Sequence, residues 1–218
     1  MSATPEIDGV SIVLLGSFNP SIFQPWWFLA NGLASEPQVE AAEIRLIVPE
    51  AVDLSMCSCN FRITRNRFSA ETLEDPPVVR DLVAGVFSLL KHTPVRSMGL
   101  NRTQHFRVAS EDEWHAIGDR LAPKDIWEAV LEGRPGLLSL TVQGARPDSY
   151  DGRVNVKIEP SAKVQHGVFF EYNDHYVVSE SGEDKESASI VLEILSESWQ
   201  EFMRRSSNLN SALFESVR

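Results

Sequence analysis

Residues 11–20 read Ser-Ile-Val-Leu-Leu-Gly-Ser-Phe-Asn-Pro. The apolar run within it predicts a strand over about Val10–Leu15. The five residues that follow, Gly16-Ser17-Phe18-Asn19-Pro20, have the composition of a turn. The residues after Pro20 show whether this strand and turn belong to a known motif.

The turn resembles the opening of the nucleotidyltransferases that make dinucleotide cofactors, in which Gly-Ser/Thr-Phe-Asn/Asp-Pro precedes His-x-Gly-His. In that family the two histidines bind the triphosphate. The matching positions here are Ile22, Gln24 and Pro25, so the charge stabilisation that phosphoryl transfer requires is missing. No P-loop or complete Gly-x-Gly-x-x-Gly replaces it. We therefore expect no catalytic residue and no cofactor, and a nucleotidyltransferase ranks third among the hypotheses.

The remaining pattern predicts alternating groups of strands and helices. The strands are short apolar or alternating runs bounded by Gly, Pro or Asn, and they cover about 10–15, 43–48, 52–59, 60–69, 96–108, 137–145, 152–159 and 166–178. The last of these is either one strand or a hairpin. The helices have apolar residues at helical spacing, and they cover about 25–30, 76–92, 110–121, 123–131 and 187–209.

This order of elements predicts an α+β fold. We expect a single domain over residues 1–218, with a mostly antiparallel, curved sheet covered on one face by long helices. A TBP-like or a helix-grip-like arrangement satisfies the order. A pseudo-duplicated β-α-βββ-α unit satisfies it too, as two fused half-repeats, 1–93 and 94–218.

A second resemblance concerns most of the chain. The strand segment Gly99-Leu100-Asn101-Arg102, the aromatic strand 168–174 and the closing helix that ends Trp199…Phe202 resemble a sporadically distributed family of uncharacterised prokaryotic proteins of about this length. The opening 16–25 is similar to one bacterial hypothetical-protein subgroup. This resemblance implies a bacterial origin and no particular activity.

Composition and charge limit which partners and which location are expected. The 218 residues are 43% hydrophobic and include eleven Phe and five Trp, enough for a large core. The formal charge of −11 repels nucleic-acid phosphates, so a nucleic-acid partner is not expected. The polar N-terminus lacks the features of a signal peptide, and no apolar run has the length of a membrane span. We expect a cytoplasmic protein with no membrane partner.

Four groups of residues are candidates for chemistry or stand out in the sequence. Cys57 and Cys59 are expected to be small core residues, because a zinc site needs further ligands and none lies nearby. The Glu180–Glu186 run is expected to be a solvated loop. Arg204-Arg205 is expected on the wet face of the last helix. Asn173-Asp174-His175 is expected to be a hairpin turn, because Asn-Asp is a common turn pair.

Five residues are the candidate ligand- or partner-binding residues. Asn101 and His105 would share one strand face and, with Arg102, could line a pocket for an anion or a peptide; the alternative is cross-strand hydrogen bonding on a solvent face. Trp26 and Trp27 could form an exposed recognition patch, and the alternative is that they fill the core.

Two hypotheses for function follow from these observations. The first is a non-catalytic bacterial protein that binds a protein partner, for example in a conflict, defence or toxin-immunity system, with a homodimer as a further expectation. An exposed apolar patch would favour it. The alternative is a small-molecule-binding protein or enzyme, with a pocket between sheet and helix lined by Asn101, Arg102 and His105.

Overall fold

The computed structural model describes residues 4–133, 135–180 and 186–217, apart from the side chains of 216 and 217. Its strands are β1 (Ile7–Gly16), β2 (Glu43–Val48), β3 (Ala51–Met56), β4 (Cys59–Thr64), β5 (Arg67–Thr72), β6 (Val95–Arg107), β7 (Leu140–Ala145), β8 (Gly152–Pro160) and β9 (Gly167–Val177). Its helices are η1 (Pro20–Ile22), α1 (Pro25–Ala30), α2 (Glu36–Glu40), α3 (Pro76–Leu89), α4 (Glu111–Leu121), α5 (Asp125–Glu128), α6 (Ser187–Glu197) and α7 (Trp199–Val217).

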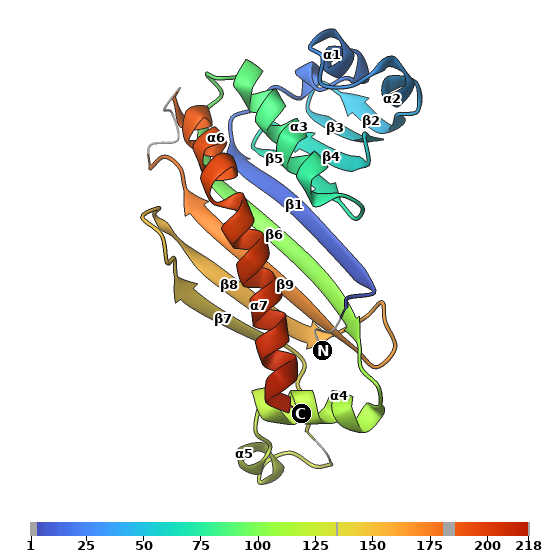
Figure 1. Cartoon of the computed structure of the whole chain (residues 1–218), viewed down its shortest axis with the longest axis vertical. Coiled ribbons are helices and arrows are strands. Elements are labelled where there is room, and N and C mark those ends of the chain that lie inside the picture. The colour runs from blue at the N-terminus through green and yellow to red at the C-terminus, as the bar shows by residue number, and fades with distance from the viewer. Residues whose placement is uncertain (1–3, 134, 181–185, 218) are drawn as a thin grey trace.

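The nine strands form one antiparallel sheet in the order β2-β3-β4-β5-β1-β6-β9-β8-β7. Helices α3, α6 and α7 lie across one face of it (Figure 1). The expected α+β class and the curved antiparallel sheet are confirmed. The sheet face opposite these helices, called the open face below, carries no helix in the described part of the chain.

The strand order is similar, but not equal, on the two sides of the central β1–β6 pair. The four later strands of the first half extend from β1 to one edge, and the three later strands of the second half extend from β6 to the other edge. The first half therefore has one strand more than the predicted β-α-βββ-α unit. The duplication itself, and a boundary between half-repeats near Thr93-Pro94, stay predictions.

Several element boundaries differ from those predicted. The predicted strands 52–59 and 60–69 are three strands, because Cys57 and Ser58 adopt positive φ angles of 54° and 57° in one turn and Arg65-Asn66 form a second turn. The region 166–178 is a single strand, and the closing helix is divided at Ser198.

The predicted helix 123–131 is reduced to the four residues of α5, and the sequence does not predict α2. Most of the Glu180–Glu186 run, residues 181–185, lies outside the described residues.

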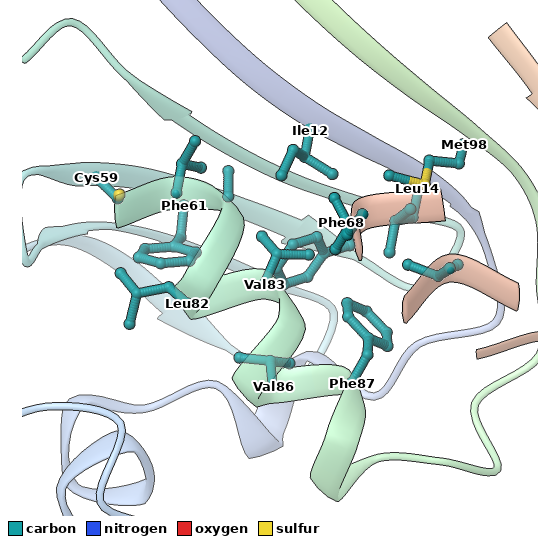
Figure 2. Close-up of a cluster of buried hydrophobic side chains, with 14 of the residues drawn as sticks. Ile12, Leu14, Cys59, Phe61, Phe68, Leu82, Val83, Val86, Phe87 and Met98 are labelled. Atoms are coloured by element: carbon teal, nitrogen blue, oxygen red, sulfur yellow. The ribbon is translucent and has the colours of Figure 1, made fainter. Parts of the chain in front are cut away.

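Aromatic rings fill the core between α3 and the first half of the sheet (Figure 2). Phe68 lies at the centre, with its ring centroid 5.2 Å from that of Phe87 and 5.5 Å from that of Phe23. Phe61 and Phe18 lie slightly farther from it, at 6.3 and 6.2 Å. Edge-on and tilted packing of this kind adds to the stabilisation that burial alone provides.

Strand alternation places every second side chain in this core and the others on the open face. Val10, Ile12 and Leu14 of β1 are buried, while Ser11 and Val13 point to the opposite side. The same alternation applies to β6 and β9. The side chains that do not face the core therefore lie together on the open face.

Candidate functional site

A row of polar side chains crosses the open face, with one residue from each strand. Successive members lie opposite each other in the strand register, from β7 at one edge to β2 at the other. The members of this polar row are Gln143, Asn155, Asn173, Asn101, Ser11, Glu71, Asn60, Ser55 and Glu43. The row depends on the register of all nine strands, and its members are widely separated in the sequence.

Five members of the polar row are joined by hydrogen bonds that all run in one direction. Gln143 Nε2 donates to Asn155 Oδ1 at 2.9 Å, and Asn155 Nδ2 donates to Asn173 Oδ1 at 3.0 Å. Asn173 Nδ2 then donates to Asn101 Oδ1 at 2.6 Å, and Asn101 Nδ2 donates to Ser11 Oγ at 3.3 Å. Aligned hydrogen bonds of this kind polarise one another. The chain of amides ends at the Ser11 hydroxyl, near the centre of the sheet.

A hollow of about 560 Å³ lies at this point on the open face, and is called the central hollow below. Small residues, among them Ser11, Val13 and Gly99, line it together with the larger Arg62 and Arg67. The Arg67 guanidinium makes no hydrogen bond or ion pair with any residue that the structure describes. Arg62 has a single ion-pair contact, at 3.6 Å to Asp53, and its side chain is 66% exposed. The central hollow therefore has a cationic side.

The candidate residues of β6 do not converge on one pocket. Asn101 lies in the central hollow, while Arg102 points to the helical face. Arg102 donates to both carboxylate oxygens of Asp8, at 2.9 and 2.6 Å, and to Ser206 Oγ at 3.0 Å. His105 is buried near the end of β6, where its Nδ1 lies 2.8 Å from Ser161 Oγ. Arg102 joins β1 to α7, which is a structural role.

The two candidate tryptophans have different environments. The ring of Trp27 packs edge-on against Phe23 and Phe28, with centroid distances of 5.9 and 5.3 Å. Trp26 is 67% exposed on the surface of α1. Trp27 therefore extends the core and Trp26 is exposed, while a recognition role for Trp26 stays a prediction.

Five large apolar side chains are exposed together around α5 and the segment after it. Ile126 and Val130 are 68% and 73% exposed, Trp127 and Leu131 are 46% and 52% exposed, and Leu138 is 84% exposed. Trp127, Leu131 and Leu138 line one hollow of about 380 Å³. We call these five residues the α5 patch. Figure 1 shows α5 at one end of the molecule and α1 at the other, so the α5 patch and Trp26 belong to separate surfaces.

A buried ionic cluster on the helical face was missed in the sequence. The predicted hairpin turn at Asn173-Asp174-His175 is wrong, because these residues lie inside β9 and Asp174 is completely buried. The prediction of a wet face for Arg205 is wrong too, because Arg205 Nη2 lies 2.5 Å from Asp174 Oδ2; Arg204 is exposed as expected. Local turn propensity and helix polarity gave no sign that a strand and a distant helix pair here.

Arg146 completes this cluster from the loop between β7 and β8. Its Nη1 lies 3.7 Å from Asp174 Oδ2, its Nη2 donates to Asp148 at 2.5 Å, and its guanidinium lies 3.6 Å from the centroid of the Tyr176 ring. Burial raises the pKa of Asp174, against the opposing effect of Arg205 and Arg146. The signal available in the sequence was the alternation of Phe170, Tyr172, Asp174 and Tyr176, which places Asp174 on the buried face.

The structure offers little for metal or thiol chemistry. Within residues 4–133, 135–180 and 186–217 there is no group of three or more His, Cys, Asp or Glu side chains that could hold a metal ion. Cys59 is buried at the start of β4, and burial raises the pKa of its thiol to about 12. A thiol with this pKa is a poor nucleophile at neutral pH. None of the described helices combines the length and the apolar character needed to cross a membrane.

Comparison of the chain with family models, with curated proteins and with solved structures finds no match. The resemblance to a sporadic prokaryotic family therefore stays a prediction.

Proposed function

We propose that this chain is a non-catalytic binding protein that docks a partner protein on the α5 patch. The observation that supports this proposal is the exposure of five large apolar side chains on one short segment. Contiguous apolar surface on a soluble domain is unfavourable in water and commonly marks an interaction site. Trp127 would be the main anchor, because tryptophan is enriched among the residues that contribute most to protein interfaces.

Acidic residues around the α5 patch favour a basic partner. Asp125, Glu128 and Glu132 are exposed on the same segment, while Lys124 is directed to Asp119, with its Nζ 3.6 Å from Oδ1. The whole chain carries a formal charge of −11. We therefore favour a partner that presents an apolar surface rimmed by Lys and Arg, since opposite charges would steer the two proteins together.

The biological setting is part of the same proposal. A bacterial conflict, defence or toxin-immunity system would supply a partner of this kind, and the resemblance stated above supports a bacterial origin. A cytoplasmic location is part of this proposal. The alternative function, a pocket between sheet and helix lined by Asn101, Arg102 and His105, has less support because the three side chains do not converge.

The experiment is affinity capture of the tagged protein from its native cells with quantitative mass spectrometry. The variant Ile126→Asp/Val130→Asp changes two exposed residues of the α5 patch, and Trp26→Asp is the matched control at the other end of the molecule. We expect one stoichiometric partner with the wild type and Trp26→Asp, and at least a tenfold loss with the double variant. A partner captured equally by all three proteins would contradict the proposal.

The charge component is tested by repeating the capture at high salt. Screening of the acidic rim should reduce recovery of the partner, while the apolar contact is maintained or strengthened. Light scattering of the purified wild type and double variant then tests self-association. A homodimer that the double variant abolishes would identify a second copy of this chain as the occupant of the α5 patch, in place of a basic partner.

A further inference from the structure

Of the two arginines on the cationic side of the central hollow, Arg62 has one ion-pair contact, with Asp53, and Arg67 has none with any described residue. Arg62 and Arg67 come from the neighbouring strands β4 and β5 and line the same hollow. The chain has 31 Asp and Glu residues against 20 Lys and Arg, yet no described carboxylate pairs with Arg67. Guanidinium groups present planar sets of N–H donors that suit a phosphate or a carboxylate.

The polar row supplies directed hydrogen-bonding groups beside these arginines. Ser11 Oγ accepts from Asn101 at the end of the chain of amides, and the Ser11 hydroxyl proton is not donated to any described residue. Asn173 uses one N–H and one oxygen lone pair within the row, so one of each remains for a ligand. The carboxylates of Glu71 and Glu171 line the same hollow as acceptors.

This mixture of free donors and acceptors matches hydroxyl groups, each of which both donates and accepts. The volume of about 560 Å³ lies within the usual range of small-molecule sites. Gly99 contributes to this space, because a Cβ atom there would lie only 3.2 Å from Asn173 Nδ2. The imidazole of His175 is the single ring in the described lining of the hollow, so this lining includes no Phe, Tyr or Trp on which a nucleobase would stack.

We infer that the central hollow binds a small anionic carbohydrate, with its phosphate or carboxylate group on Arg62 and Arg67 and its hydroxyl groups on Ser11, Asn173 and the two glutamates. This site is on the open face and is independent of the α5 patch. Its ligand is a polyhydroxylated molecule with one acidic group, and the acid could be either a phosphate ester or a carboxylate.

The test uses the full chain and four probes at matched ionic strength. Glucose 6-phosphate and glucuronate carry the two kinds of acid on a hexose, while glucose and inorganic phosphate each provide half of the proposed chemistry. Binding is measured by calorimetry and by the side-chain amide signals of Asn101 and Asn173 in nitrogen-15 NMR spectra. We expect at least one of the two acidic sugars to bind at least tenfold more tightly than both glucose and inorganic phosphate, and to shift both amide signals.

Two arginine variants separate this site from general charge attraction. Arg67→Ser removes the guanidinium without a partner, and Arg65→Ser is the matched control, since Arg65 is exposed two residues away and pairs with Glu50 at 3.3 Å. Arg67→Ser should weaken binding of the acidic sugar at least tenfold, and Arg65→Ser less than twofold. The inference is overturned if neither acidic sugar binds at 10 mM, if inorganic phosphate binds as tightly as the sugars, or if the two variants have equal effects.

Discussion

Replacement of Arg205 by methionine should destabilise the protein far more than the same replacement of Arg204. The two arginines are adjacent in α7, but their surroundings differ. Arg205 Nη2 lies 2.5 Å from Asp174 Oδ2, and the side chains are 15% and 0% exposed. The Arg204 side chain is 61% exposed and, among the described residues, its ion-pair partner is Glu201. Methionine keeps most of the length and apolar contact of the arginine stem, so the comparison isolates the loss of charge.

The magnitude follows from what remains around Asp174. Without Arg205, the one ion-pair contact left to its buried carboxylate among the described residues is Arg146, whose Nη1 is 3.7 Å away and whose Nε and Nη2 donate to Asp148. Removing one partner of a buried ion pair costs about 3–5 kcal/mol, and we take the lower end, about 3 kcal/mol, because Arg205 is not fully buried. An exposed pair such as Arg204–Glu201 contributes about 0–1 kcal/mol.

The assay is equilibrium unfolding in urea followed by tryptophan fluorescence and circular dichroism. We expect the free energy of unfolding to fall by about 3 kcal/mol for Arg205→Met and by less than about 1 kcal/mol for Arg204→Met, with similar m-values. The further change Asp174→Asn in the Arg205→Met background should recover part of the loss, because it removes the unpaired charge. Equal destabilisation by the two arginine variants would refute the buried-cluster reasoning.

Three further predictions concern the core, a turn and the pH dependence of stability. Phe68→Ala should lower the free energy of unfolding in urea by about 3–5 kcal/mol, because it empties the centre of an aromatic cluster. Gly152→Ala should lower the free energy of unfolding by at least about 2 kcal/mol, since Gly152 has φ +143° and a Cβ there would lie 1.9 Å from His175 O. In the control Gly144→Ala, the added Cβ meets no atom within 4 Å, so the free energy of unfolding should change by less than about 1 kcal/mol. Burial lowers the pKa of His105 and His175, so as the pH falls these histidines take up protons in the unfolded chain before they do so in the folded protein. The free energy of unfolding should therefore decline as the pH falls below about 6.5. Urea titrations between pH 7.5 and 5.5 should show a smaller decline for His105→Gln/His175→Gln than for the wild type.

The elements with strong local signals were predictable from sequence. Val154, Val156 and Ile158 alternate with polar residues and lie in β8 as expected. Ser110 Oγ accepts from Glu113 N at 3.1 Å at the predicted start of α4. Both signals lie within a few residues, where side-chain periodicity and capping chemistry act directly.

The errors occurred where distant partners override local preference. Asn173-Asp174 has turn propensity, but pairing with β6 and β8 on both sides extends the strand through it. The break at Arg65-Asn66 was missed because the apolar alternation continues on both sides of the turn. In each case the deciding contacts involve strands that the local sequence does not specify.

For the candidate sites too, local signals were informative and contacts between distant segments were not predictable. Asn101 was selected because the β6 segment is dense in polar residues, and it does lie at the centre of the open face. Its partners Asn155, Asn173 and Gln143 are not assignable from sequence, because their alignment with Asn101 depends on the register of four strands, β6 to β9. The α5 patch was unforeseen because the segment 123–131 was expected to be a longer helix. Only the tertiary structure shows that these apolar residues remain uncovered.

Site-specific photo-crosslinking in the native cells is the most direct test of docking on the α5 patch. A photoreactive phenylalanine analogue would replace Leu138, which is 84% exposed, and in a separate protein would replace Trp26, which is 67% exposed. We expect one discrete covalent adduct with a partner protein from position 138 and none from position 26. An adduct from position 26 alone, or no adduct from position 138, would contradict the proposal that the α5 patch is the docking surface.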